Sequence, residues 1–84
     1  MLRISYFNWR EDFLEHIDLG HGVQQYEIRE VFANNPNIRR DGKDNQTREY
    51  KYLAHGRTNA GHYLRVVFIY QKKGHALIIS AFDV

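Results

Sequence analysis

Residues 63–71 decide the fold of this chain, and they read YLRVVFIYQ. Aromatic and β-branched side chains fill most of this stretch, and both kinds favour extended backbone. A turn signal lies on each side of it, Asn59 with Gly61 before the stretch and Lys73-Gly74 after it. Asparagine and glycine tolerate the positive φ angles that tight turns between antiparallel strands require. The pattern therefore predicts a strand over 63–71 that is paired with a strand on either side.

The two flanking strands are predicted over residues 48–57 and 75–82, which makes the three strands an antiparallel meander. If Lys73-Gly74 is a two-residue turn, Tyr70 lies opposite Leu77. One sheet face then carries an apolar set that we expect to lie under helices: Leu64, Val66, Phe68, Tyr70, Leu77, Ile79 and Ala81. The other face is mixed and carries Tyr63, Arg65, Val67, Ile69, Gln71, Ala76, Ile78, Ser80 and Phe82. A partly apolar second face favours a binding partner.

The N-terminal part of the chain predicts a short strand followed by a helix. Residues 2–7 alternate weakly between apolar and polar side chains, which indicates a strand. Asn8 and Glu11 have the spacing of a capping box, so we expect a first helix to begin there and to end at Gly20. The apolar face of this helix would hold Trp9, Phe13, His16 and Ile17.

A second helix is predicted over residues 24–33 from its apolar spacing. Ile28, Val31 and Phe32 form the side that faces the core, Glu27 and Glu30 face water, and Pro36 stops the helix. The polar run over 37–47 contains Asp41-Gly42, which indicates a loop or the tip of a loose hairpin. A short strand over 38–40 leads into it.

These elements predict one α+β domain that covers residues 1–84. It has a short N-terminal strand, two helices, and an antiparallel meander with both helices packed on one face. The 84 residues allow a single core, and the absence of cysteine excludes disulfides and thiolate metal sites. No segment is long and apolar enough to span a membrane, so we expect a cytoplasmic protein without membrane contact.

Charge is divided unevenly along the chain. Residues 1–36 hold three Lys/Arg against six Asp/Glu, whereas residues 37–84 hold nine against four. This division is typical either of one acidic and one basic face or of helices and strands that differ in surface charge by chance. A basic sheet face would attract a polyanion or an acidic protein.

Most catalytic chemistries find no support in this sequence. The serines lack the sharp glycine-flanked turn of a nucleophile, and the glycines do not form a phosphate loop. The histidines His16, His21, His55, His62 and His75 lack the spacing of metal ligands, so neither a metal nor a cofactor is expected. We expect His55, on the side of its strand shared with Leu53, to be partly buried and hydrogen-bonded.

Cleavage of RNA by its own 2′-hydroxyl needs few groups: a base, an acid, cations around the phosphate and a surface for stacking. The predicted sheet supplies Arg57, His62, Arg65, Lys72, Lys73 and His75 as charged or titratable groups. It supplies Tyr50, Tyr52 and Tyr63 as ring faces. The alternative is that these residues have no function beyond facing solvent on an ordinary sheet.

Two runs of residues resemble the BrnT toxin family. The first contains His16-Ile17, His21-Gly22-Val23, Glu27, Glu30-Val31-Phe32 and Asn35-Pro36. The second contains residues 52–58, which read YLAHGRT, then residues 61–64, Val66-Val67-Phe68 and residues 78–81, which read IISA. Together they cover most of the chain except the loop around residues 40–47. Where the family has arginines, this chain has His62 and Phe82, and it ends at Val84 before most of the family's C-terminal helix.

The resemblance implies a RelE-like fold and an mRNA endoribonuclease, ribosome-linked or free, of a type II toxin–antitoxin pair. It also implies inhibition by a cognate antitoxin, a small DNA-binding protein. We assign metal-independent catalysis to His62, Arg65, Lys72 and His75, and contact with the RNA substrate to Arg57, Tyr63, Tyr52 and Lys73. Two alternatives stay open. One is a catalytically degenerate module that binds RNA or protein, and the other is an oligomerisation domain whose sheet edges pair in a homodimer.

Overall fold

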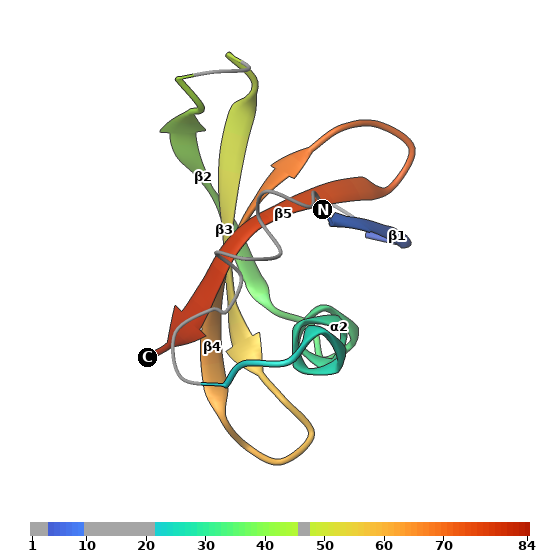
Figure 1. Cartoon of the computed structure of the whole chain (residues 1–84), viewed down its shortest axis with the longest axis vertical. Coiled ribbons are helices and arrows are strands. Elements are labelled where there is room, and N and C mark those ends of the chain that lie inside the picture. Colours follow the sequence, from blue (N-terminus) through green and yellow to red (C-terminus); the bar gives the residue numbers. More distant parts are fainter. Residues whose placement is uncertain (1–3, 10–21, 46–47) are drawn as a thin grey trace.

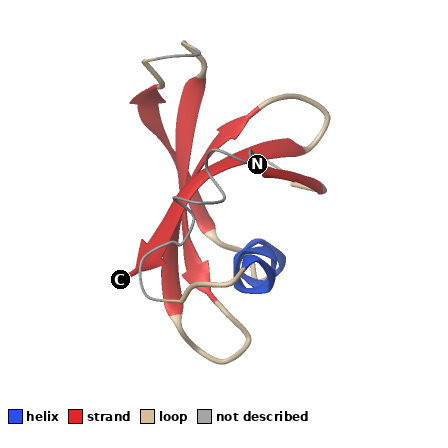
Figure 2. Ribbon diagram, in the orientation of Figure 1, coloured by secondary structure: helices blue, strands red, loops and turns tan. Residues whose placement is uncertain are grey.

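A computed structural model describes residues 4–9, 22–45 and 48–84. Its elements are β1 (Tyr6–Trp9), α2 (Gln25–Ala33), β2 (Asn37–Lys43), β3 (Tyr50–Arg57), β4 (Tyr63–Tyr70) and β5 (His75–Asp83). The strands form one twisted sheet in the order β1-β5-β4-β3-β2, with α2 beside it (Figures 1 and 2). The stretch over residues 63–71 therefore contains the middle strand of the sheet, β4.

The predicted meander is confirmed, because β3 pairs antiparallel with β4 and β4 pairs antiparallel with β5. The turn between β3 and β4 is closed by Gly61 at φ 91°. In the turn between β4 and β5, Lys73 and Gly74 both have positive φ, at 52° and 82°. Two consecutive residues with positive φ are typical of a type I′ turn, whose backbone twist matches that of the paired strands.

The register of β4 and β5 contains two slips that cancel. Beside the turn, His75 N donates to Lys72 O while Gln71 N donates to His75 O, so Lys72 is an extra residue on its side. Tyr70 consequently lies opposite Ala76, and the predicted pairing of Tyr70 with Leu77 is wrong. Further along, Ile79 is skipped between the pairs Phe68–Ile78 and Val67–Ser80. This bulge restores the predicted register over the rest of the ladder.

The slips decide which residues of β5 face the core. On the helix face of the sheet, Ala76 and Ile78 join the core in place of Leu77 and Ile79. The buried cluster of the helix face comprises Ala54, Leu64, Val66, Phe68, Ala76, Ile78 and Ala81, with Val23, Ile28 and Val31 from the α2 region. Leu53, Ile69 and Leu77 are buried on the opposite side, which we call the second face. Both sides of the sheet are thus apolar at their centre.

The helix α2 begins and ends as predicted. Gln24 is its N-cap, and the Gln24 N–H donates to Glu27 Oε1 at 2.9 Å. Ile28 and Val31 are fully buried against the sheet, and Phe32 is partly buried. A Cβ on Gly56 would come within 3.0 Å of Pro36 Cβ and Val31 Cγ1. Glycine at this position therefore lets the end of α2 pack directly on β3.

The predicted α+β architecture, with two helices on one face of an antiparallel sheet, is wrong. Strands hold 54% of the described residues and helix only 13%, and the sheet is mixed because β1 runs parallel to β5. Asn8 and Trp9, predicted to begin a helix, extend the first strand instead and pair with Leu77 and Ile78. The rest of the predicted first helix lies outside the described residues.

The short strand predicted over residues 38–40 is confirmed, but it continues through Asp41-Gly42, where a loop or the tip of a hairpin was expected. Residues 37–43 form β2 and pair with β3, with an irregularity between Arg40 and Lys43 where Gly42 has φ 82°. The neighbouring strand supplies partners for backbone groups regardless of side-chain polarity, which explains why a polar segment joins the sheet. Among the described residues, no helix is long and apolar enough to cross a membrane.

Thr58 is a buried polar residue that holds the turn between β3 and β4. It is 1% exposed, and its Oγ1 accepts a hydrogen bond from His62 N at 3.1 Å. Thr58→Val keeps the shape but leaves that N–H without its acceptor, so we expect the free energy of unfolding to fall by about 1 kcal/mol. Urea unfolding measures this loss. Hydrogen exchange at the His62 amide should rise in Thr58→Val but not in Thr58→Ser, and equal exchange in both would contradict the assigned bond.

Candidate nucleic-acid interface

Four strands place a row of side chains across one end of the second face. The register pairs Asn37 with His55, His55 with Arg65, and Arg65 with Phe82. Side chains directly opposite each other on paired strands have Cβ atoms about 4.5–5.5 Å apart. The row therefore brings an amide, an imidazole, a guanidinium and an aromatic ring into one line.

Three residues of this row also line a small hollow of about 130 Å³. Its lining residues are Asn37, Arg39, Leu53, His55 and Arg65. Arg39 and His55 are exposed and Arg65 is half-buried. Within the described part of the chain, Arg65 Nε is buried and has no hydrogen-bond partner. A buried donor without an acceptor is costly, so its missing partner must be supplied from elsewhere, by a water, an ion or a ligand. We call this feature the His55–Arg65 hollow.

Arg57 and Tyr63 lie directly opposite each other at the edge of the hollow, where β3 and β4 meet their turn. Tyr63 is 54% exposed, and its ring centroid lies 6.0 Å from that of His55. The Arg57 carbonyl accepts from Asn34 Nδ2 at 2.8 Å, which ties the strand to the end of α2. The edge thus offers a cation and a ring face beside the hollow.

The hollow brings together only part of the set that the sequence predicts. Arg65, Arg57 and Tyr63 share this end of the second face. His62 is exposed in the adjoining turn, just outside the row. Tyr52 lies on the helix face, where its ring stacks on Phe68 with centroids 5.7 Å apart.

The other three predicted site residues lie at the far end of β4. Lys72 and Lys73 are exposed in the turn after that strand, and His75 begins β5. Arg65 and Lys72 are seven positions apart in sequence, which corresponds to roughly 20 Å along an extended strand. Lys72, Lys73 and His75 therefore cannot act on the same phosphate as Arg65.

Sequence reasoning missed Asn37, Arg39 and His55. The prediction that His55 is partly buried is wrong, because its side chain is exposed. The turn over residues 58–61 held the missing signal, since pairing Arg57 with Tyr63 across it places His55 opposite Arg65. Asn37 and Arg39 could not be placed in the same way, because they were assigned to a loop and to a short strand without register.

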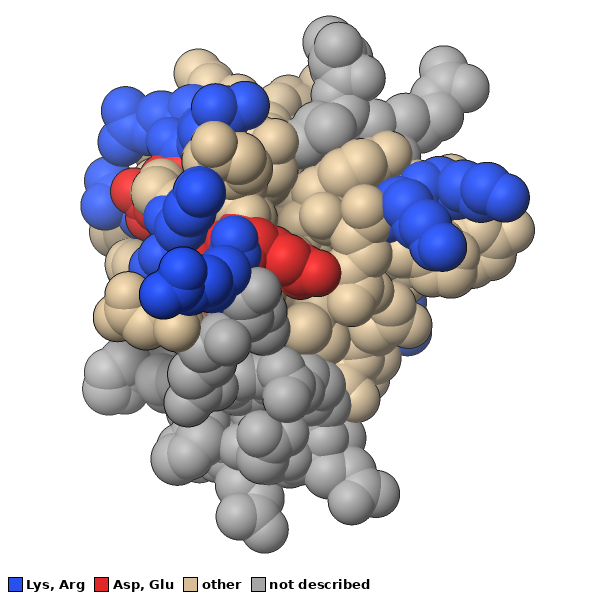
Figure 3. Space-filling view, turned by 90° about the horizontal axis from the view of Figure 1, so that it is seen from above, with Lys and Arg blue, Asp and Glu red and all other residues tan. Residues whose placement is uncertain are grey.

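Positive charge gathers in two separate groups, as Figure 3 shows from above the sheet. In Figure 3 acidic side chains lie among those of the larger group. Arg39, Arg40 and Lys43 of β2 are all exposed. Arg40 Cζ lies 4.2 Å from the ring centre of Tyr50, and Lys43 Nζ lies 5.1 Å from it. These two cations share the helix face with Tyr52, so Arg39 alone of the three borders the hollow.

Within the described residues, no three or more His, Asp or Glu side chains gather in a way that could hold a metal ion. The side chains at the hollow offer an imidazole opposite one guanidinium group, a second guanidinium group on the neighbouring strand, and an aromatic ring beside them. No protein-family model matches this chain, and no curated protein sequence matches it either.

Proposed function

We propose that this protein is an endoribonuclease that cleaves unpaired RNA at the His55–Arg65 hollow without a metal ion. The observation that supports this most directly is the row across the sheet, in which His55 faces the half-buried Arg65 and has Arg39 nearby. An imidazole exchanges protons near neutral pH, and guanidinium groups bind phosphate oxygens with two parallel hydrogen bonds. Among the described residues the buried Arg65 Nε has no acceptor, and a phosphate oxygen would supply one.

The reaction that suits these groups is attack of the ribose 2′-oxygen on the adjacent phosphorus. His55 takes the proton of the 2′-hydroxyl as the new oxygen–phosphorus bond forms. Arg65 and Arg39 stabilise the negative charge that accumulates on the phosphoryl oxygens. The bond to the 5′-oxygen breaks, and that oxygen takes a proton from water. The products are a 2′,3′-cyclic phosphate and a free 5′-hydroxyl. Tyr63 and Arg57 would hold the flanking base and phosphate.

The toxin role rests on the resemblance of residues 16–36 and 52–81 to BrnT toxins. Under this proposal the RNA substrate is mRNA, and a cognate antitoxin, itself a small DNA-binding protein, blocks the hollow. The basic character of residues 37–84 suits an acidic segment of such a partner.

A second candidate function is binding of RNA without cleavage. One observation favours it: among the described residues that line the hollow, His55 is the only side chain of a type that commonly serves as a general acid or base, and no carboxylate lines it. Efficient transfer of two protons usually needs both an acid and a base. A site with only one such group would bind an RNA phosphate and release it intact.

The two candidates differ in the products formed from a labelled, unpaired RNA in the presence of a chelator. We expect cyclic-phosphate products from the wild-type protein, and a loss of about 10²- to 10⁴-fold in rate for His55→Ala. His62→Ala is the matched control, because His62 is exposed outside the row, and it should stay within a few-fold of wild type. Full activity in His55→Ala would refute the assigned site. Tight binding of intact RNA by wild type would favour the second candidate.

A further inference from the structure

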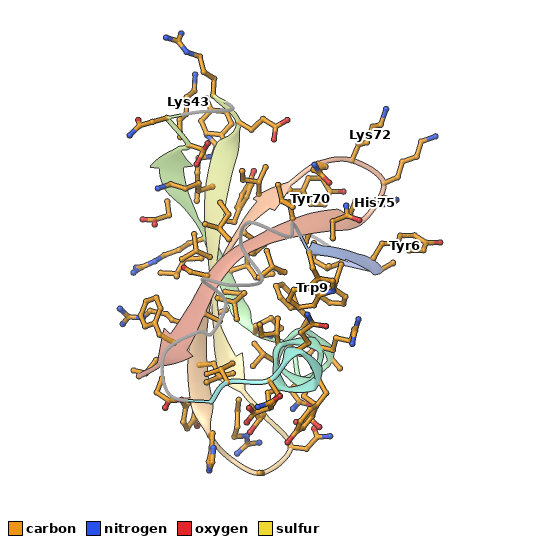
Figure 4. All side chains as sticks on the ribbon, viewed as in Figure 1. Tyr6, Trp9, Lys43, Tyr70, Lys72 and His75 are labelled. Carbon is orange, nitrogen blue, oxygen red and sulfur yellow. The ribbon has the colours of Figure 1, made fainter. Side chains whose placement is uncertain are left out.

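A pair of stacked rings lies at the opposite end of the second face from the hollow. Tyr6 of β1 and His75 of β5 are direct partners in the parallel ladder. Their ring centroids are 4.6 Å apart with an angle of 20° between the planes. Figure 4 shows the two side chains next to each other at the start of their strands. Tyr6 is 58% exposed, so one aromatic surface of the pair is available to solvent.

Several hydrogen bonds hold this pair in place. The backbone N–H groups of Ser5 and Tyr6 both donate to Gly74 O, at 2.8 and 3.0 Å. Gly74 N in turn donates to Tyr70 Oη at 3.2 Å. Beside the rings, Asn8 Nδ2 donates to Gln71 Oε1 at 2.8 Å. The start of β1 and the turn after β4 are therefore linked, and the rings are positioned before any ligand arrives.

The charged side chains in the described segments that carry the two rings are lysines. Lys72 and Lys73 are exposed in the adjoining turn, and segments 4–9 and 70–79 contain no Asp or Glu. Lys72 extends from this turn away from the body of the protein in Figure 4. Figure 3 shows a basic group here that is separate from the larger one at β2. A rigid aromatic surface beside uncompensated lysines is the combination that binds single-stranded nucleic acid, through base stacking and phosphate contact.

We propose that Tyr6, His75, Lys72 and Lys73 form a second subsite that binds an unpaired stretch of the RNA substrate and takes no part in cleavage. This inference rests on the proposed function for the identity of the ligand. A stacking surface requires an unpaired base, which selects single-stranded RNA over a duplex. His75 serves as the inner layer of the stack beneath Tyr6, and its roughly 20 Å separation from Arg65 keeps it away from the bond that breaks.

The test measures binding of a single-stranded oligonucleotide of twelve nucleotides with 2′-deoxyribose throughout. This probe keeps the bases and phosphates but lacks the 2′-hydroxyl that cleavage needs. Stacking on one ring changes affinity by about 5- to 100-fold. We therefore expect Tyr6→Ala to weaken binding within that range and Tyr6→Phe to bind within about two-fold of wild type. Tyr26→Ala is the matched control, because Tyr26 is 59% exposed on α2, and it should bind normally.

The lysines are tested by the salt dependence of the same binding. Removing one cation that neutralises a phosphate of a single strand reduces the slope of log K against log salt by about 0.7, so the double variant Lys72→Ala/Lys73→Ala should have a slope shallower by about 1.4. Normal binding by Tyr6→Ala, or an equal weakening in Tyr26→Ala, would overturn the proposal. If the subsite binds as expected but the corresponding RNA is never cut, the subsite stands and the nuclease assignment fails. If RNA cleavage depends on His55 while Tyr6→Ala and the double lysine variant bind normally, the nuclease assignment stands and the subsite proposal fails.

Discussion

Replacing Arg65 with alanine is expected to reduce RNA cleavage by about 10²- to 10³-fold, the usual effect of losing one group that stabilises transition-state charge. The folded protein should not become less stable, because the substitution removes a buried Nε that has no partner in the described residues. Cleavage rates under single-turnover conditions and urea unfolding of the same samples measure the two effects. Loss of activity without loss of stability would separate a catalytic role from a structural one.

Two comparison variants sharpen this result. Arg40→Ala removes an arginine from the neighbouring strand, but Arg40 is exposed on the helix face over Tyr50 and should cut RNA at the wild-type rate. Arg65→Lys keeps the charge but loses the two-pronged contact with phosphate, so its rate should fall between those of wild type and alanine. An Arg65→Ala protein that cleaves as fast as Arg40→Ala would remove Arg65 from the site.

Phe68→Ala should lower the free energy of unfolding by about 3–5 kcal/mol. The Phe68 ring is fully buried, stacks on Tyr52 and makes an edge contact with Phe32 at 5.2 Å between centroids. It thus joins β3, β4 and α2, and Phe32 continues the contact to Phe7 of β1 at 5.2 Å. A domain of this size has only about 4–13 kcal/mol of stability, so the variant would be close to unfolding at room temperature.

Phe82→Ala provides the control for that loss, because it deletes the same ring from a site on the second face that is 40% exposed. Its effect on the free energy of unfolding should be within about 1 kcal/mol. Chemical denaturation monitored by far-ultraviolet circular dichroism compares the two variants directly. Similar losses in both would mean that the core is not centred on Phe68.

The elements that sequence predicts correctly are those determined by local chemistry. The strand around Val66 and Phe68 forms because its branched and aromatic side chains suit extended backbone, and α2 forms because Ile28 and Val31 recur at helical spacing. Lys73-Gly74 turns the chain where expected, since glycine accepts positive φ. In each case the decisive interactions lie within a few residues of one another.

The incorrect predictions concern residues whose structure depends on distant partners. Asn8 and Trp9 fit a helix start locally, but they pair with Leu77 and Ile78, almost seventy positions away. Asp41 and Gly42 look like turn residues, yet they continue the strand predicted over 38–40 while β3 lies beside it. The extra residue at Lys72 is invisible in composition, yet it changes which residues of β5 reach the core.

The candidate site shows the same division. Arg65, Arg57 and Tyr63 can be found from sequence because local signals place their strand and its turn. The same turn places His55 opposite Arg65, but the exposure of His55 could not be found in this way, because it depends on which elements cover the sheet. The sequence prediction places Lys72 and His75 in one site with Arg65 because their side chains have suitable chemistry. Residue type does not say how far apart the side chains lie in the folded protein. Register across the strands supplies that information.

The parallel pairing of β1 with β5 has a consequence for the synthesis of this chain. Among the described residues β1 pairs only with β5, so Phe7 and Trp9 lack this strand partner until β5 has been made. At roughly 5–20 residues per second, a ribosome needs on the order of 10 s to add the residues between Trp9 and Ile78. During that interval these two aromatic side chains lack their neighbours on β5, whereas Phe32 and Arg29, which contact them in the folded protein, have already been made. Strand β1 therefore joins the sheet only after β5 is available, although it precedes the other strands in the chain.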